Sequence, residues 1–516
     1  MLFKKNRSRN STSFFLCLFA LLGVAASCNN SPGRPADRLV IGIETGPSVL
    51  DPRFATDAVS SHICRLIYSG ILKRNKNSEL VPDLAEKVEQ PDPQTYIITL
   101  KKGVFFHNGD QLSSKDVLFT FQTIMDPEQS SPKRSALEKI QSLRSPDAHT
   151  LIITLKEPFS PFLGNLTLGI VPDSSTDLAK YPVGSGPFSF NQYQKDEKLS
   201  LQAFPRYFAG KPLISGVDFR VIPDETVRIL ELKKGSIDMV TNPITPALLP
   251  WLKKQKKIRV ETSPGTNASY IGFNLRDPVL KNKKVRLALA HAIDRKSIIT
   301  HLLKGLAVES TSILSPKNTF FNTATSQVSF NPELAEKLLD EAGYPKPEGS
   351  APRLVLTYKT SKNPTRRKIA EIFAQQFKKI GVTIEILSTE WGTFYSDIKS
   401  GRFQVYSLTW VGIADPDIYH YIFHSENIPP VGANRGHFLN EEVDDLLVAG
   451  RKEVNTQKRK DIYNKVQEIL AAELPYINLW ISVNVAAMRE RVQNFVIYPD
   501  DSFDSISRVK LTKIEK

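Results

Sequence analysis

The chain has 516 residues, of which 24% are charged and 41% hydrophobic, and its formal net charge at pH 7 is +14. The basic residues are spread among acidic ones, which argues against a nucleic-acid partner, because that would need a concentrated basic face with stacking aromatics. The length is sufficient for two or three domains with their own cores.

The first 27 residues have the pattern of a cleaved signal peptide. A basic stretch without acids precedes an apolar run over residues 14–24, which is too short to span a bilayer comfortably, since that takes about 20 residues. Four lysines and arginines lie in this segment, so the mature chain would carry a net charge of +10 (14 − 4). We therefore expect export.

The sequence VAASC, which ends at Cys28, resembles a bacterial lipoprotein box, although Ala25 stands where such boxes usually have leucine. In that family the cysteine becomes the first residue of the mature chain and carries the lipid. Residues 28–37 are rich in Asn, Ser, Pro and Gly, which predicts a flexible tether. The expected location is the periplasm, with the lipid on Cys28 anchoring the protein to a membrane.

Neither a disulfide nor an enzyme is expected. The chain has three cysteines, and beyond the signal segment only Cys64 is left once Cys28 is lipidated. GxSxG, HExxH and P-loop motifs are absent from the sequence. We predict no catalytic residues and no cofactor.

Hydrophobic periodicity predicts helices and strands that follow one another along the chain. Strand, helix and strand over residues 216–241 form a βαβ unit, which implies parallel strands. The turn PVGSGPF at 182–188 separates this unit from the part before it. In this first half, strands are expected at 38–44, 150–156, 216–222 and 237–241, and helices at 113–124 and 223–235.

The second half of the chain alternates more regularly and predicts an α/β sheet with helices on its faces. A long helix is expected over 282–305, and a strand over 475–488 is expected to return to the earlier part of the chain. The alternating strands are expected at 353–359, 382–388 and 403–410, with helices at 365–381 and 391–401 between them.

Two turns after strands are candidates for a ligand cleft, because open α/β sheets bind ligands beyond the carboxyl ends of their strands. Strand 403–410 continues into VGIADPD, and strand 38–44 continues into TGPSVLDP. Two such ends facing each other across a hinge would form a cleft. We expect Ser48 and Val49 of the second turn to contact a ligand there.

Seven motifs in order, among them VLDP, PVGSGPF and ANRGHFLNEEVDDLL, resemble the large extracytoplasmic solute-binding proteins of ABC importers, in the oligopeptide, dipeptide and nickel group. The resemblance covers nearly the whole mature chain. It implies the type II periplasmic-binding-protein fold, and a monomer that closes around a peptide and passes it to a membrane permease driven by an ATPase. It also implies lobe I at 38–54, 181–272 and 479–516, an inserted domain at 55–180, and lobe II at 273–478.

Peptide binders of this family usually carry a segment like W-x-x-D-x-x-D-P, in which the first Asp pairs with the ligand's ammonium. Here Trp410, which we expect to form a cleft wall, is followed by VGIADPD, and Ile413 stands where that Asp is expected. We expect Asp415 or Asp417 to replace it, because a buried ammonium without a carboxylate is costly. If neither does, the ligand lacks a free N-terminus, as in modified peptides, cell-wall fragments or glutathione-like peptides.

Further contacts are expected from three segments. The glycine-rich turn would bring Gly184 and Ser185 close to a ligand, and Arg435 would meet a carboxylate. His420 and His424 are four residues apart, so a helix would place both imidazoles on one face. Because some family members bind nickel complexes or haem, this pair makes a metal-chelate or haem carrier the alternative to an oligopeptide receptor.

Overall fold

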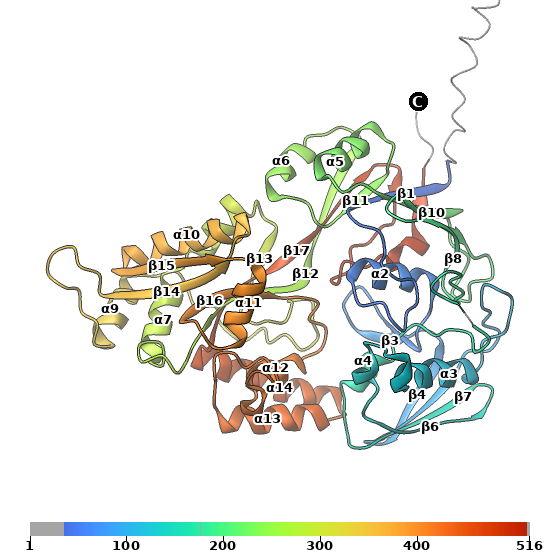
Figure 1. Ribbon diagram of the computed structural model, residues 1–516, viewed down its shortest axis with the longest axis horizontal. Helices are drawn as coiled ribbons and strands as arrows, with labels where there is room; N and C mark the ends of the chain where they lie inside the picture. Colours follow the sequence, from blue (N-terminus) through green and yellow to red (C-terminus); the bar gives the residue numbers. More distant parts are fainter. Residues whose placement is uncertain (1–35, 176, 513–516) are drawn as a thin grey trace, which may run out of the picture.

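The computed structural model describes residues 36–175 and 177–512. The predicted signal peptide and Cys28 lie outside the described residues. Within the described ranges, no helix has the length and apolar character that a membrane crossing requires. The described chain is a mixed α/β structure whose two halves lie on either side of a central pair of long strands (Figure 1).

One eleven-stranded sheet runs through both halves of the molecule. Its order is β15-β14-β16-β12-β17-β11-β1-β10-β9-β8, and β13 pairs with β17. The strands are β1 (Arg38–Ile43), β8 (Phe188–Gln194), β9 (Lys198–Ala203), β10 (Gly216–Val221), β11 (Met239–Thr241), β12 (Ile258–Phe273), β13 (Ala307–Glu309), β14 (Leu354–Ser361), β15 (Val382–Thr389), β16 (Val405–Trp410) and β17 (Tyr476–Arg489).

Strands β12 and β17 connect the two halves. They pair antiparallel, and their register shifts between Pro264 and Ala268 and again between Ser269 and Tyr270. Strand β17 also pairs with β11 of the first half, as predicted for a strand that returns to the earlier part of the chain. Such breaks in register leave backbone groups outside the regular ladder and bend a strand locally, so the two strands are irregular where they cross between the halves.

The first half is built around β1, which lies between β10 and β11 and is parallel to both. The parallel strands predicted from the βαβ pattern are therefore present. Helix α5 (Glu225–Lys234) crosses between β10 and β11, begins at the capping side chain of Asp224 and ends at Gly235, whose φ is +90°. Residues from β1, β10 and β11 share one buried apolar core with helix α2 (Ala58–Ile67).

A second apolar core belongs to a four-stranded antiparallel sheet in the order β4-β5-β7-β6, which lies below α2 in Figure 1. Helix α3 (Ser114–Met125) begins with a capping box formed by Ser113 and Asp116. The strands are β4 (Ala85–Asp92), β5 (Thr95–Leu100), β6 (Ile140–Asp147) and β7 (Thr150–Leu155), and a hairpin of β2 (Leu72–Arg74) and β3 (Leu80–Pro82) precedes them.

The second half contains the predicted alternation of strands and helices, with β14 parallel to β15 and to β16. The single helix predicted over 282–305 is wrong. Helix α7 (Lys283–His291) ends at His291. A separate helix, α8 (Arg295–Ser297), begins after Asp294, because the Asp294 side chain caps it by accepting a hydrogen bond from the Ser297 amide. A π-helical turn, η4 (Ile298–Leu302), follows.

Helices cover the faces of this second half. They are α9 (Pro332–Glu341), α10 (Pro364–Lys379), α11 (Trp391–Lys399), α12 (Ile418–Phe423), α13 (Glu441–Lys452) and α14 (Thr456–Glu473). The short helices α4 (Phe162–Asn165) and α6 (Leu249–Leu252) and the two-residue strands β18 (Val492–Gln493) and β19 (Lys510–Leu511) complete the α-helices and β-strands of the described residues. The exact limits of the two lobes and the inserted domain stay a prediction.

Candidate ligand-binding cleft

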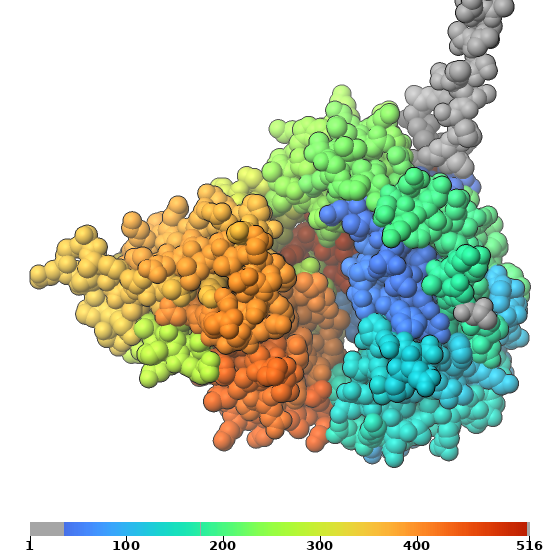
Figure 2. All heavy atoms as spheres, viewed as in Figure 1, coloured from blue at the N-terminus to red at the C-terminus, as the bar shows by residue number. Residues whose placement is uncertain are grey.

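A cavity of about 730 Å³ lies between the two halves, where Figure 2 shows the molecule hollowed between the blue and the orange segments. One wall comes from α2, β2 and the segment around residues 498–508. The opposite wall comes from Thr266 of the connecting strand β12 and from Gly412 and Ala414 after β16. The carboxyl end of β16 therefore borders a cavity, as the sequence predicted.

The carboxylates that line the cavity already have basic partners. Asp83 lies 2.8 Å from the Lys73 ammonium. Arg65 contacts Asp500 at 2.8 Å and Asp504 at 3.4 Å. Burial raises the pKa of Asp504 to about 6, and the positive charge of Arg65 only partly offsets this.

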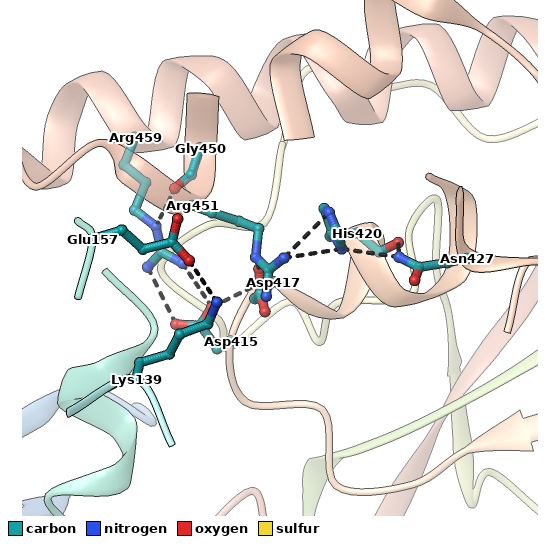
Figure 3. A network of polar contacts seen from close by, with 9 residues as sticks. All are labelled: Lys139, Glu157, Asp415, Asp417, His420, Asn427, Gly450, Arg451 and Arg459. Atoms are coloured by element: carbon teal, nitrogen blue, oxygen red, sulfur yellow. Dashed lines mark hydrogen bonds and ion pairs between the residues drawn. The ribbon is translucent and has the colours of Figure 1, made fainter. Parts of the chain in front are cut away.

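The two aspartates predicted to hold an ammonium are each paired with an arginine (Figure 3). Asp415 accepts hydrogen bonds from Arg459 at 2.7 and 3.2 Å. Asp417 lies 2.9 Å from Nε of Arg451. Both arginines belong to the α13–α14 region, so the pairs fasten the turn after β16 to these helices. A ligand ammonium that bound either carboxylate would have to share it with the arginine. Ligand contact by Asp415 or Asp417 therefore stays a prediction.

Arg451 also touches the first half of the chain. Its guanidinium lies 5.0 Å from the centre of the Phe159 ring, and its carbonyl accepts a hydrogen bond of 2.8 Å from the Ser160 amide. The Ser160 hydroxyl donates to the carbonyl of Glu453. In Figure 3 the side chains of Lys139 and Glu157 approach the same network from this side. The end of α13 is thus a contact between the two halves.

Ile413 occupies an apolar position, not a ligand-facing one. Its side chain is 4% exposed and belongs to the core formed with α12 to α14. Its amide donates a hydrogen bond of 3.3 Å to the carbonyl of Thr266. The residue that stands in place of the expected aspartate therefore ties the turn after β16 to the connecting strand β12.

Trp410 and Arg435 form one stack at the end of β16. The Arg435 guanidinium lies 4.8 Å from the centre of the Trp410 ring and donates hydrogen bonds to the hydroxyls of Tyr270 and Tyr395, at 3.0 and 3.3 Å. No carboxylate of the described residues lies within 4.0 Å of this buried arginine. The pairing of Arg435 with a ligand carboxylate stays a prediction.

The glycine-rich turn packs against the end of α2. A side chain on Gly184 would meet the carbonyl oxygen of Ile67 at 2.1 Å. Ser185 is fully buried, and its carbonyl accepts a hydrogen bond from the Ser69 hydroxyl. The glycine is therefore needed for close packing, and ligand contact by this turn stays a prediction.

The turn after β1 is tied to the start of α2. The amides of Ser48 and Val49 donate to the Ser60 hydroxyl at 2.9 and 3.2 Å, and the Ser48 hydroxyl donates to Asp57. Asp57 also caps α2. These bonds fix the turn at the amino end of a helix whose other residues line the cavity.

The two histidines proposed as metal ligands are engaged in local contacts. Their rings stack at 4.5 Å, Asn427 Nδ2 lies 3.0 Å from Nδ1 of His420, and the Glu426 amide donates to Nδ1 of His424. Burial and the charge of Arg451 lower the pKa of His420 to about 4. Among the residues that the structure describes, no group of three or more His, Cys, Asp or Glu is placed to hold a metal ion.

None of the eight residues predicted to bind the ligand lines the cavity in the described part of the chain, although the neighbours of Trp410 and Asp415 do. The ionic residues that do line the cavity were not predicted from the sequence, since they come from distant segments with no shared motif. The only local signal was the basic and polar face of the amphipathic segment at 58–67. The missed residues are Arg65, Arg74, Lys133, Asp500 and Asp504.

Two α/β lobes joined by two long strands, with a cavity between them, define a hinged solute-binding protein. Residues 79–429 match the model for the family described as "Bacterial extracellular solute-binding proteins, family 5 Middle". The chain belongs to this family of extracytoplasmic substrate-binding proteins of ABC importers.

Two curated relatives show how similar the chain is to characterised members. The dipeptide-binding protein of Escherichia coli is 27% identical over 498 residues, which cover 90% of this chain and 93% of that protein. The heme-binding protein A of Haemophilus influenzae is 29% identical over 477 residues, with 86% of each chain covered.

Two solved structures of the same fold differ in how well this chain superposes on them. The oligopeptide-binding protein AppA of Bacillus subtilis in complex with a nonapeptide has 26% identity, covers 92% of this chain and 99% of its own, and gives a TM-score of 0.71. The murein tripeptide binding protein MppA in its unliganded open form has 23% sequence identity to this chain. The match covers 93% of this chain and 98% of MppA, with a TM-score of 0.81.

Proposed function

We propose that this protein captures oligopeptides in the cavity between its lobes and delivers them to a membrane permease driven by an ATPase. The carrying observation is the cavity of about 730 Å³ lined from both sides, which lies in the range of about 300–1,000 Å³ typical of ligand sites. The lipid predicted on Cys28 would hold the receptor at the membrane, near its permease.

We infer that the described conformation is the open one. The chain gives the higher TM-score with an unliganded open form, even though its identity to the peptide-bound AppA is greater. A ligand that touches both walls would stabilise the closed arrangement, since it binds that state better than the open one. The predicted contacts of Trp410, Asp415, Asp417 and Arg435 belong to that closed state.

A metal-chelate or haem carrier is the alternative, favoured by the likeness to a heme-binding protein. The hydrogen bonds and the ring stacking of His420 and His424 weigh against it, because both imidazoles already have partners. A ligand without a free ammonium, such as a modified peptide, agrees with the pairing of Asp415 and Asp417 to arginines.

A thermal-shift screen tests the proposal. The purified protein is melted with pooled dipeptides to pentapeptides, with Ni²⁺ plus free histidine, and with hemin. A rise in Tm with at least one peptide pool and none with the other two supports peptide capture. A rise with nickel–histidine or hemin alone contradicts it.

A further inference from the structure

The ionic side chains that line the cavity are unevenly balanced. Six of them are lysine or arginine and three are aspartate. The basic residues are Arg65, Lys73, Arg74, Lys133, Lys211 and Arg508, and the acidic residues are Asp83, Asp500 and Asp504. Arg65 and Lys73 form ion pairs with these three aspartates. The excess positive charge of the cavity therefore lies on the other basic residues.

Arg74 and Lys133 are the deeper two of these remaining cations, since both are partly buried, whereas Lys211 and Arg508 are exposed. The Arg74 guanidinium donates one hydrogen bond of 2.8 Å to the carbonyl of Ser78. Within the described ranges, no carboxylate lies within 4.0 Å of either Arg74 or Lys133. Both cations therefore face the cavity without an acidic partner.

Burial lowers the pKa of Arg74 and that of Lys133, and the charge of Arg65 lowers both further. The charges of Asp415 and Asp500 offset this only in part at Arg74, and that of Asp51 only in part at Lys133. Burial and a like charge both disfavour the charged form of a base. An anion in direct contact with either cation would relieve the rest of this cost, because the carboxylates of the protein that act on them lie more than 4.0 Å away.

We propose that the cavity selects acidic peptides, and that Arg74 and Lys133 hold carboxylates of the ligand. The proposal rests on the function proposed above and adds the substrate class. Among the described residues, the aspartates that line the cavity are paired with Lys73 and Arg65, so the unpaired charge that faces a ligand is positive.

The two cations approach the cavity from different elements. Arg74 ends strand β2, and Lys133 precedes the short helical turn η2 (Arg134–Ala136). Cys64 of α2 lies in the same wall, and burial raises the pKa of its thiol to about 12, so the thiol adds no negative charge near neutral pH.

Isothermal titration calorimetry with three tripeptides tests the proposal: Glu-Ala-Glu, Ala-Ala-Ala and Lys-Ala-Lys. The wild-type protein is expected to bind Glu-Ala-Glu at least tenfold more tightly than Lys-Ala-Lys. Arg74→Gln and Lys133→Gln should each reduce the affinity for Glu-Ala-Glu about tenfold, a typical loss for one desolvated charge contact. Lys115→Gln removes an exposed charge of α3 outside the cavity and should change nothing.

Equal affinity for the three peptides, or a preference for Lys-Ala-Lys, would overturn the acidic preference while leaving peptide capture intact. Failure of all three peptides to bind would instead contradict the proposed function itself. Arg74→Glu guards against a merely structural effect, because reversal of the charge should shift the preference toward Lys-Ala-Lys. Inorganic phosphate is the last probe, and binding of phosphate more tightly than any peptide would overturn the assignment of the anion as a peptide carboxylate.

Discussion

At the scale of single residues, the turn after β16 holds one buried apolar residue followed by two aspartates that are paired with arginines. Ile413 is buried in an apolar core at the position where peptide binders of the family usually have an aspartate. The two aspartates that follow it, Asp415 and Asp417, are paired with arginines of the same lobe. Both acidic groups of this turn thus contact the adjacent helices through ion pairs.

Replacement of Asp415 by asparagine is expected to lower the free energy of unfolding by about 2 kcal/mol, because it leaves the buried guanidinium of Arg459 without its carboxylate. Urea denaturation followed by circular dichroism measures this change. Asp445→Asn is the matched control, since Asp445 is an exposed aspartate of α13. A loss of less than about 0.5 kcal/mol, the size usual for surface substitutions, would contradict the structural role.

The stability conferred by Asp417 is expected to depend on pH in an unusual direction. Burial raises its pKa from the ordinary 3.8 to about 6, more than the charge of Arg451 lowers it. The folded chain therefore takes up a proton before the unfolded chain does, and this group adds stability as the pH falls from about 6 to about 4.

Comparison of the wild-type protein with Asp417→Asn isolates this effect, because the variant cannot titrate at that position. Chemical denaturation at several pH values should show the wild-type protein gaining on the order of 1 kcal/mol relative to the variant between pH 6 and pH 4. A relative loss over the same range would mean that Arg451 stabilises the charged carboxylate more than burial destabilises it.

At the scale of elements, the sequence predicted the strands and helices with regular patterns. β1, β14, β15 and β16 appear where alternation or a short apolar run indicated them, and the return of β17 to the first half of the chain was also predicted. The helix at 282–305 was predicted as continuous because its apolar spacing persists across residues 292–294. The side-chain cap at Asp294 ends one helix and starts another within that spacing.

The cavity-lining residues could not be predicted in the same way. Arg65, Arg74, Lys133 and Asp504 come from segments far apart in the chain, and only the tertiary fold brings them to one wall. The turn after β16 was placed correctly at the cavity, but the ion pairs with Arg451 and Arg459 were not foreseen, because these arginines lie on helices 34 or more residues further along.

Gly184→Ala is expected to lower the free energy of unfolding by about 1–3 kcal/mol, since its methyl group would collide with the backbone of α2 at Ile67. Gly392→Ala is the control, because Gly392 lies within helix α11 with nothing within 4 Å of the added carbon, and alanine favours a helix. Thermal denaturation distinguishes the two. Equal melting temperatures for Gly184→Ala and the wild-type protein would show that the turn has more room than the structure gives it.

At the scale of the whole molecule, one continuous sheet runs through both halves and connects them. Only β12 and β17 join the halves within the sheet, and their register breaks between Pro264 and Ala268. The contact of Arg451 with Phe159 and Ser160 lies at a different place, at the end of α13. Closure around a ligand would therefore bend the connecting strands while this contact limits how the lobes slide.

Small-angle X-ray scattering is expected to show this closure. Saturating Glu-Ala-Glu should decrease the radius of gyration of the wild-type protein, because a ligand that bridges both walls stabilises the more compact state. Arg74→Gln should remain at the larger radius at the same peptide concentration. A bound peptide, shown by calorimetry, that leaves the radius unchanged would contradict closure.

Native mass spectrometry of gently purified protein tests the central claim, peptide capture, most directly. We expect co-purified masses spread over peptides of a few residues, which tandem spectra identify as enriched in glutamate and aspartate. A single sharp mass that is not a peptide, such as haem or a metal chelate, would contradict it.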